Sequence, residues 1–193
     1  MDNITIKPVT DDDLLDFAHL FWQYRNEELA NEPESLSQKV CLEKALSNFE
    51  DSKKYQQIMR DDAVAIGIAE GKESNSGSYV SDGIFIVGYR RGEGLGKLIK
   101  QEQIKYAKDI GFPVMNGFVL DTNTASLATM RSLNIELIGK RAGYTFTIDL
   151  SQDLSVLIGE KEYLFSLFFT QFINGKVPSV GNMVSLLDVF DKA

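Results

Sequence analysis

Arg91-Gly92-Glu93-Gly94-Leu95-Gly96-Lys97 is the segment that decides the fold of this 193-residue chain. Residues 83–88, immediately before it, read Gly-Ile-Phe-Ile-Val-Gly and predict a short buried strand. Residues 97–110, immediately after it, carry apolar side chains at three-residue spacing, which predicts an amphipathic helix ending at Gly111. The glycines therefore lie on a strand-to-helix turn.

This turn has the features of an anion-binding site. The first backbone N–H groups of a helix lack internal partners, and the helix dipole stabilises an exposed anion there by about 0.3–1 kcal/mol. Glycines let a ligand approach the backbone without a Cβ in the way. Basic residues gather around the turn in a chain of net charge -8: Arg90, Arg91, Lys97 and Lys100. We therefore expect a phosphorylated ligand.

Two common phosphate motifs fit the turn poorly. A Walker A loop needs Ser or Thr after its lysine, but Leu98 follows Lys97. The dinucleotide fingerprint needs a third glycine where Lys97 stands. It also needs an acidic residue about 20 residues after the loop, and Asp121 lies somewhat further along the chain than that. A plain glycine-rich turn with surface arginines is the alternative to a phosphate site.

Residues 91–96 fit the pattern Arg-x-x-Gly-x-Gly, which resembles the pyrophosphate loop of the GNAT superfamily of acetyl-CoA-dependent N-acetyltransferases. The predicted elements between residues 4 and 150 also follow an order similar to that of the family. This resemblance implies an α/β (α+β) fold with a mixed central sheet of six to seven strands. Two parallel strands splay apart in that sheet, and four helices flank it. The expected strands are 4–9, 55–59, 63–69, 83–88, 114–120, 135–138 and 144–150, and the expected helices are 10–25, 35–49, 97–110 and 125–133.

The resemblance implies a set of residues that bind the co-substrate acetyl-CoA. Backbone groups of Phe85, Ile86 and Val87 are expected to bind the pantetheine arm and polarise the thioester carbonyl. Asn123 and Ser126 match a second family signature, in which the Asn opens the helix after the splayed strand; a plain helix cap is the alternative for Asn123. The pyrophosphate is expected on Arg91, Gly92, Glu93, Gly94, Leu95, Gly96 and Lys97.

One position departs from the family pattern. Met130 stands where many relatives carry a Tyr that protonates the leaving thiolate, and a thioether cannot donate a proton. The thiolate then leaves unaided, or another residue serves, with Tyr144 and Tyr106 as candidates. A third outcome is a chain that binds acyl-CoA as a sensor or interaction module without turnover.

Amine acetylation needs a neutral amine, so a general base is expected near the start of the loop strand. Asp82 is the first candidate and Glu70 the second, although Asp82 also fits a turn residue before Gly83. His19 is the only histidine and Cys41 the only cysteine, which leaves no His-rich metal site and no metal in the predicted mechanism.

Composition narrows the class of partner. A sequence pI of 4.7 argues against a nucleic-acid surface and makes a small amine or polyamine slightly more attractive than an acidic substrate. A single cysteine, no basic leader and no apolar stretch of membrane-spanning length predict a cytoplasmic protein without a membrane partner.

Two regions are expected. Residues 1–150 form the GNAT-like acyl-CoA-binding domain. Residues 151–193 form a helical extension that packs on the same domain or makes a homodimer interface.

The predicted activity is transfer of an acetyl group from acetyl-CoA to a primary amine of a small molecule or peptide, by direct attack in a ternary complex. The alternatives are the acyl-CoA-binding module and a nucleotide-binding α/β domain unrelated to coenzyme A.

Overall fold

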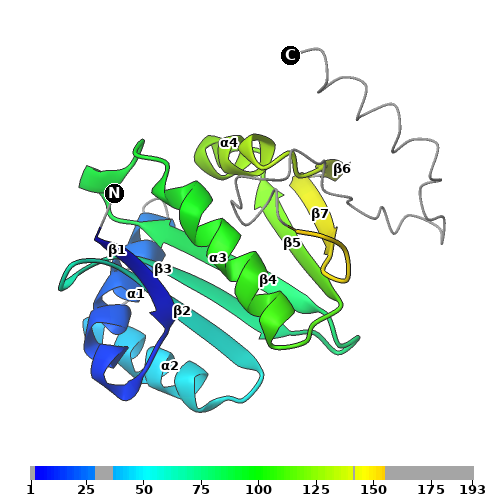
Figure 1. The fold of residues 1–193 in the computed structure, drawn as a ribbon. Coiled ribbons are helices and arrows are strands. Elements are labelled where there is room, and N and C mark those ends of the chain that lie inside the picture. The colour runs from blue at the N-terminus through cyan, green and yellow to red at the C-terminus, as the bar shows by residue number, and fades with distance from the viewer. Residues whose placement is uncertain (1–2, 29–36, 141, 155–193) are drawn as a thin grey trace, which may run out of the picture. The chain divides into compact units, whose positions relative to one another are not determined.

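The computed structural model describes residues 3–28, 37–140 and 142–154, so the predictions for residues 155–193 lie outside the described part. Seven strands form one mixed sheet in the order β1-β2-β3-β4-β5-β7-β6, with β4 and β5 parallel (Figure 1). This confirms the predicted fold class. The strands are β1 (Ile4–Pro8), β2 (Lys54–Asp61), β3 (Val64–Glu73), β4 (Tyr79–Ile86), β5 (Val114–Leu120), β6 (Ile138–Lys140) and β7 (Gly143–Asp149). The helices are η1 (Asp11–Asp13), α1 (Leu14–Glu28), α2 (Gln38–Glu50), η2 (Gly88–Arg90), α3 (Leu95–Asp109) and α4 (Thr124–Ser132).

The chain divides into two compact units. The first contains Met1–Glu73 and Asp82–Lys100; the second contains Ser74–Ser81 and the described residues from Gln101 onward.

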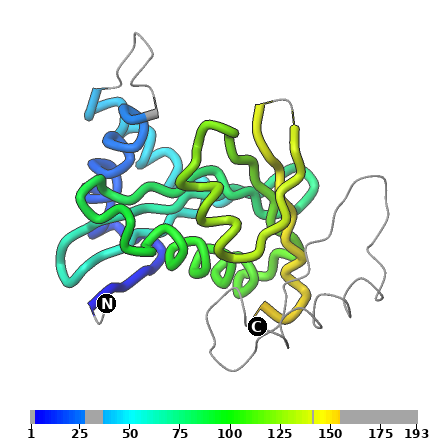
Figure 2. Tube along the Cα trace, turned by 90° about the horizontal axis from the view of Figure 1, so that it is seen from above, coloured from blue at the N-terminus to red at the C-terminus, as the bar shows by residue number. Residues whose placement is uncertain are grey.

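In the first unit, helices cover both faces of the strands. Figures 1 and 2 show α1 and α2 on one face and the beginning of α3 on the other. Fully buried apolar side chains from all of these elements form one core cluster. This arrangement follows from the strand sequences, because two covered faces require apolar side chains in both directions. The largest contributors are Phe17, Ile58, Met59, Ile66, Ile68, Leu95 and Ile99.

A buried carboxylate fixes the entry into α1. Asp13 accepts hydrogen bonds from the backbone and hydroxyl of Thr10 and forms ion pairs with Lys7 at 2.9 Å and Arg60 at 3.0 Å. Burial alone would raise the pKa of Asp13, but these bonds outweigh it and hold the pKa below its ordinary value. Asp13 therefore links β1, the start of α1 and β2 through Lys7 and Arg60.

The buried face of α2 is narrow. Cys41 and Ala45 are its buried residues, whereas Val40 and Leu46 are 44% and 38% exposed. The small side chains of the helix approach the sheet, and its neighbouring polar residues face a cavity described below. Burial also raises the pKa of the Cys41 thiol.

Strand β4 begins earlier than the residue pattern predicts, at Tyr79 rather than residue 83. Its parallel ladder with β5 contains three residue pairs, from Tyr79–Met115 to Ser81–Gly117. Residues 82–86 of β4 lie outside this ladder and belong to the first unit.

The second unit contains an antiparallel ladder between β5 and β7 that runs from Val114–Asp149 to Leu120–Gly143. Two glycines in this ladder leave no room for a side chain. A Cβ on Gly117 would overlap the Phe146 ring, and one on Gly143 would overlap the Val119 carbonyl oxygen. The short β6 extends β7 on its other side.

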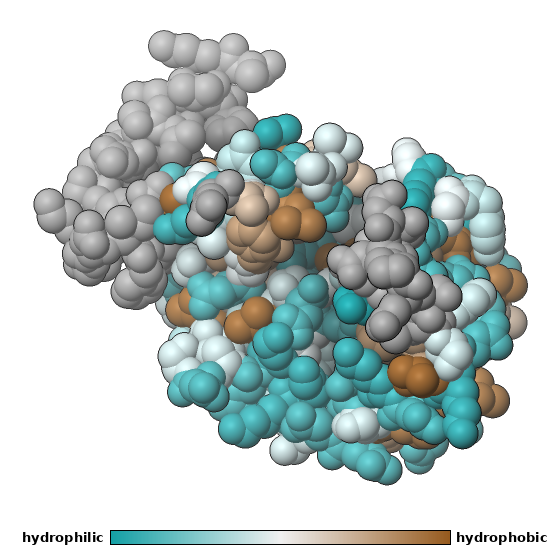
Figure 3. All heavy atoms as spheres, turned by 180° about the vertical axis from the view of Figure 1, so that it is seen from behind, coloured by the Kyte–Doolittle hydropathy of each residue, from teal (hydrophilic) through white to brown (hydrophobic). Residues whose placement is uncertain are grey.

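The surface hidden in Figure 1 is largely hydrophilic, with hydrophobic side chains scattered rather than gathered in one large patch (Figure 3). None of the helices in the described ranges combines the length and the apolar character that a membrane span requires.

Candidate active site

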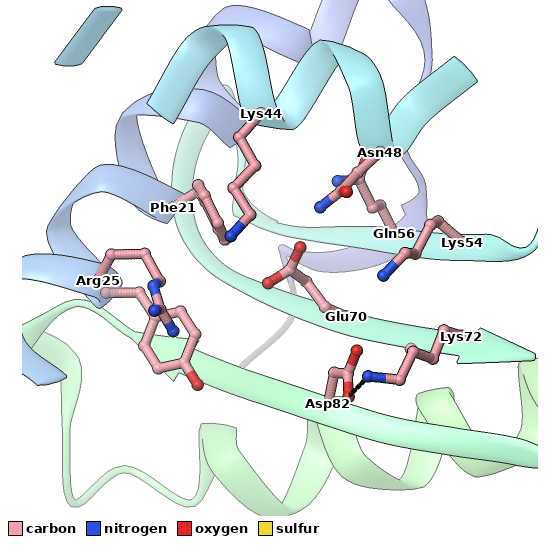
Figure 4. A pocket seen from close by; sticks show the side chains of 11 residues that line it. Phe21, Arg25, Lys44, Asn48, Lys54, Gln56, Glu70, Lys72 and Asp82 are labelled. Carbon is pink, nitrogen blue, oxygen red and sulfur yellow. Dashed lines mark ion pairs between the residues drawn. The ribbon is translucent and has the colours of Figure 1, made fainter. Parts of the chain in front are cut away.

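A cavity of about 290 Å³ lies within the first unit, between the sheet and the helices α1 and α2. Figure 4 shows polar side chains entering it from both sides. Four of the side chains that line it are cationic and two are carboxylates. The lining residues are Phe21, Tyr24, Arg25, Lys44, Asn48, Lys54, Gln56, Glu70, Gly71, Lys72 and Asp82.

The floor of the cavity is fixed by the register of the β2–β3 hairpin. Gln56 pairs with Glu70, and Lys54 pairs with Lys72. Because side chains alternate between the two faces of a strand, these four side chains share one face. Asp82 on β4 lies on the same side of the cavity as Glu70 and Lys72 (Figure 4).

The helices supply the opposite wall. Phe21 and Arg25 lie four residues apart on α1, and Lys44 and Asn48 lie four residues apart on α2, so each pair shares a helix face. Tyr24 packs beside Gly83, where an added Cβ would approach its hydroxyl to 2.8 Å. Tyr24 therefore lines the cavity where α1 packs against β4.

Glu70 has the most perturbed carboxyl group of the cavity. The pKa of Glu70 is raised to about 7, chiefly by burial and also by the negative charge of Asp82. The Gln56 amide, Lys54 and Lys44 oppose this rise. A carboxyl group with a pKa near neutrality exchanges protons readily at physiological pH, which suits a general base.

Asp82, the first candidate from sequence, lies in the same cavity but is differently placed. Its carboxylate forms an ion pair with Lys72 at 2.8 Å and is 33% exposed. The structure thus brings both predicted carboxylates together in one cavity, with Asp82 paired to Lys72 and Glu70 more deeply buried.

Gln56 is buried beside Glu70, with 7% of its surface exposed. Neither its amide nitrogen nor its amide oxygen forms a hydrogen bond of normal geometry within the described part of the chain. Buried amides nearly always have partners. The amide of Gln56 lies close enough to the Glu70 carboxyl group to lower its pKa, so Gln56 is part of the surroundings of that carboxyl group.

The glycine turn is also in the first unit. Gly92 and Gly94 have φ angles of +85° and +81°, a left-handed conformation that other residues adopt at a cost. A Cβ on either glycine would meet no atom within 4 Å, so the space above both is open. Among the described residues, the N–H groups of residues 92–96 have no backbone acceptor, whereas Lys97 and Leu98 donate to Gly94.

The arginines of this turn brace it from outside. Arg90 pairs with Asp61 and with Glu93, at 2.5 and 2.9 Å. Arg91 pairs with Glu27, donates to the Ile86 carbonyl oxygen at 2.9 Å and lies over the Phe85 ring. The predicted basic cluster is therefore partly neutralised.

Lys100, expected beside the turn, is only 1% exposed, and burial lowers its pKa to about 7. Lys97 is the exposed lysine of the turn.

Some backbone groups next to the turn already form hydrogen bonds within the protein. The Val87 N–H donates to the Ile66 carbonyl at 3.0 Å, and the Ile86 carbonyl accepts from Arg91. A role for Phe85, Ile86 and Val87 in polarising a thioester stays a prediction.

The remaining predicted site residues lie in the second unit. Asn123 caps α4, and its side-chain oxygen accepts the Ser126 N–H at 3.0 Å. Met130 is 3% exposed and packs in the interior. Tyr144 is partly buried on β7, opposite Val119. Their roles toward coenzyme A stay predictions.

Several cavity residues were missed by the sequence analysis: Arg25, Lys44, Lys54, Gln56 and Lys72. A signal for the strand residues was present. Lys54 and Gln56 alternate on one strand, and Glu70 and Lys72 alternate on the next. Polar residues in register on a face that a helix covers indicate a site rather than a core.

The described part of the chain contains no group of three or more His, Cys, Asp or Glu side chains arranged to hold a metal ion.

Comparisons with known proteins identify the fold. No family model and no curated protein sequence matches the chain. Solved structures do match. A spermidine N-acetyltransferase from Vibrio cholerae in complex with CoA and spermine has a TM-score of 0.62 and 16% identity, covering 78% of this chain and 98% of its own.

Two further structures support the same assignment. A putative acetyltransferase from Salmonella typhimurium, yncA with acetyl-CoA, has a TM-score of 0.60 and 14% identity, covering 78% of this chain and 96% of its own. The ribosomal-protein-S18-alanine N-acetyltransferase from Escherichia coli has a TM-score of 0.57 and 16% identity, covering 83% of this chain and 99% of its own. The chain therefore has the GNAT fold that its sequence resembles.

Proposed function

We propose that this chain is an acyl-CoA-dependent N-acyltransferase that moves an acetyl group from acetyl-CoA to a primary amine by direct attack. The observation that carries the proposal is Glu70, a carboxyl group with a pKa of about 7 in a cavity large enough for a small amine. The glycine turn supports it, because its open space and its N–H groups, which have no backbone acceptor among the described residues, suit an anionic ligand.

The turn fits a pyrophosphate better through its backbone than through its arginines. Residues 92–96 present N–H donors at the start of α3, where the helix dipole favours negative charge. Arg90 and Arg91 are already paired with carboxylates and hold the loop in shape. Lys97 is placed to add a positive charge at the edge of the turn. The thioester of acetyl-CoA supplies the acyl group when it is bound.

Glu70 is the proposed general base. An alkylammonium ion that enters the cavity gives one proton to Glu70 and becomes nucleophilic. Its nitrogen then forms a bond to the acyl carbon while the carbon–sulfur bond breaks. The second nitrogen proton is released, and the departing sulfur takes up a proton as free thiol. The products are an amide, free coenzyme A thiol and a protonated Glu70. Glu70 then loses its proton to solvent and is ready for the next turnover.

Asp82 supports this step without touching the amine proton. Its charge raises the pKa of Glu70, while its own carboxylate is paired with Lys72 at 2.8 Å. Met130 supplies no acid, and a thiol of ordinary acidity leaves well enough as the thiolate. Tyr144 stays the candidate acid from sequence.

The test is release of free thiol from acetyl-CoA across a panel of primary amines, with Glu70→Gln as the inactive comparator. Gln is nearly isosteric with Glu and cannot accept the proton. Turnover by the wild type and a loss of about 10²–10⁴-fold in the variant are expected. Binding of acetyl-CoA without thiol release would favour the acyl-CoA-binding module. Met130 is the residue that suggests this alternative, because it is buried where many relatives carry a proton-donating Tyr.

A further inference from the structure

The charge of the cavity is opposite to the charge of the protein. The chain has 28 acidic and 20 basic side chains, for a net charge of -8. The cavity, by contrast, is lined by Arg25, Lys44, Lys54 and Lys72 against Glu70 and Asp82. A local excess of cations inside an acidic protein is a specific feature of this site rather than a consequence of composition.

The cavity keeps its excess of positive charge after its ion pairs are taken into account. Lys72 and Asp82 neutralise each other at 2.8 Å. Neither Lys44 nor Lys54 forms an ion pair with another residue of the described ranges. Both act on Glu70 through space, so their charges lie close to the proposed base. Figure 4 shows the ends of Arg25, Lys44 and Lys54 turned toward the same cavity as the Glu70 carboxyl group.

Two further features describe what could fill the space. The buried Gln56 amide lines the cavity with Lys54, and it lies close enough to Glu70 to lower the pKa of that carboxyl group. An amide next to an ammonium group can bind the polar oxygens of an anion. The volume of about 290 Å³ is large enough for a small molecule.

We propose that the acceptor of this site is a small amine that also carries a carboxylate or phosphate, with its anionic group held by Lys44, Lys54 and Gln56 and its amine directed to Glu70. This inference rests on the proposed function for the role of Glu70. It also sets the chain apart from polyamine acceptors, because a second ammonium group would approach two lysines. The acidic composition had pointed slightly toward polyamines, and the local charge points the other way.

The test uses three amines with the same four-carbon spacing and different second groups: 4-aminobutanoate, butylamine and 1,4-diaminobutane. Binding to the full chain is measured by calorimetry, with and without coenzyme A, and thiol release is measured in parallel. The anionic amine should bind at least tenfold more tightly than butylamine, and the diamine should bind most weakly. The second arm compares the binding of 2-aminoethyl phosphate with that of ethanolamine. A gain from the phosphate that exceeds the gain from the carboxylate indicates a phosphate site, and the reverse indicates a carboxylate site.

Matched lysine variants assign the preference to the cavity. On the plateau above pH 8, Lys44→Met and Lys54→Met should each reduce kcat/KM for the preferred anionic amine, mainly through KM, by about tenfold more than they reduce kcat/KM for butylamine. The controls are Lys39→Met on the same helix and Lys53→Met beside β2, because both side chains are exposed and outside the cavity. They should leave the preference unchanged.

The outcomes separate the two proposals. Absence of thiol release with every amine overturns the proposed function, whereas the binding order still decides the inference. Equal binding of the three amines, tighter binding of the diamine, or no binding of either anionic amine overturns the inference. A preference that survives both cavity variants also overturns it.

Discussion

Glu70 should give the reaction a pH dependence that no other group in the cavity explains. With a pKa of about 7, about nine in ten Glu70 carboxyl groups are ionised at pH 8 and about one in eleven at pH 6. The profile of kcat/KM should therefore have an acid limb of unit slope with its midpoint near pH 7. It should reach a plateau above pH 8 and fall again only near the pKa of the amine itself.

The neighbours of Glu70 should move this midpoint in opposite directions. Asp82→Asn removes a charge that raises the pKa of Glu70, so the midpoint should shift to lower pH while most of the rate at pH 8 is kept. Lys54→Met removes a charge that lowers it, so the midpoint should shift to higher pH. Lys53→Met, on the exposed neighbouring residue, should leave the midpoint unchanged.

The assay is continuous detection of free thiol between pH 5.5 and 9, with butylamine as the acceptor so that the substrate has only one ionising group. A rate that rises tenfold per pH unit through pH 7 without a plateau would refute the role of Glu70, because the amine would then lose its proton to solvent. Loss of the rate in Asp82→Asn at pH 8, with Glu70→Gln unaffected, would instead make Asp82 the base.

Three further predictions concern the loop, the α1 junction and the stability cost of the base. Gly94→Arg should abolish acetyl-CoA binding by filling the open space above the turn, while circular dichroism still shows a folded chain. Gly94→Ala should lower the free energy of unfolding by about 1–2 kcal/mol in urea titrations because φ is +81°. Asp13→Asn should cost about 3 kcal/mol at pH 7, because Lys7 and Arg60 lose a buried partner. The pKa of Asp13 is depressed, so its contribution is present above the ordinary value of 3.8 and is lost at lower pH, where wild type and variant should converge. The pKa of Glu70 is raised, so the folded state keeps a proton that the unfolded state releases, and stability falls between pH 4.5 and about 7. Glu70→Gln should therefore raise the free energy of unfolding at pH 8 by roughly 1–3 kcal/mol, measured by urea titration.

Local signals in the sequence were enough for most of the elements. The apolar run at 114–120 and the helix starts at Thr10 and Ser37 depend on residues within one or two turns of each other. The glycine turn was also predictable, because its positive φ angles are a property of the glycines themselves. These features need no knowledge of distant contacts.

The exposure of Val40 on α2 and the raised pKa of Glu70 needed tertiary information. Both Val40 and Cys41 fit an apolar stripe, and only the packing on β2 selects Cys41 for burial. The pKa of Glu70 depends on cover by α1 and α2 and on the charge of Asp82. Desolvation of this kind arises from segments that are distant in sequence, so residue spacing could not rank Glu70 above Asp82.

Contacts with residues that are distant in sequence also explain why the ion pairs of the turn's arginines could not be predicted. Sequence placed Arg90 and Arg91 near the glycines, and both are there. Their ion pairs reach Asp61 and Glu27, which lie 29 and 64 residues away in the chain. A motif shows which charges gather at a turn, but not which of them are already neutralised.

The most direct test of the account is a calorimetric titration of the purified chain with acetyl-CoA, with dephospho-CoA, ATP and the Gly94→Arg variant as comparators. We predict binding on the order of micromolar for acetyl-CoA, weak or absent binding of ATP, and none in the variant. No binding of acetyl-CoA, or equal affinity in Gly94→Arg, would contradict the assignment of the turn and leave a GNAT fold without its co-substrate.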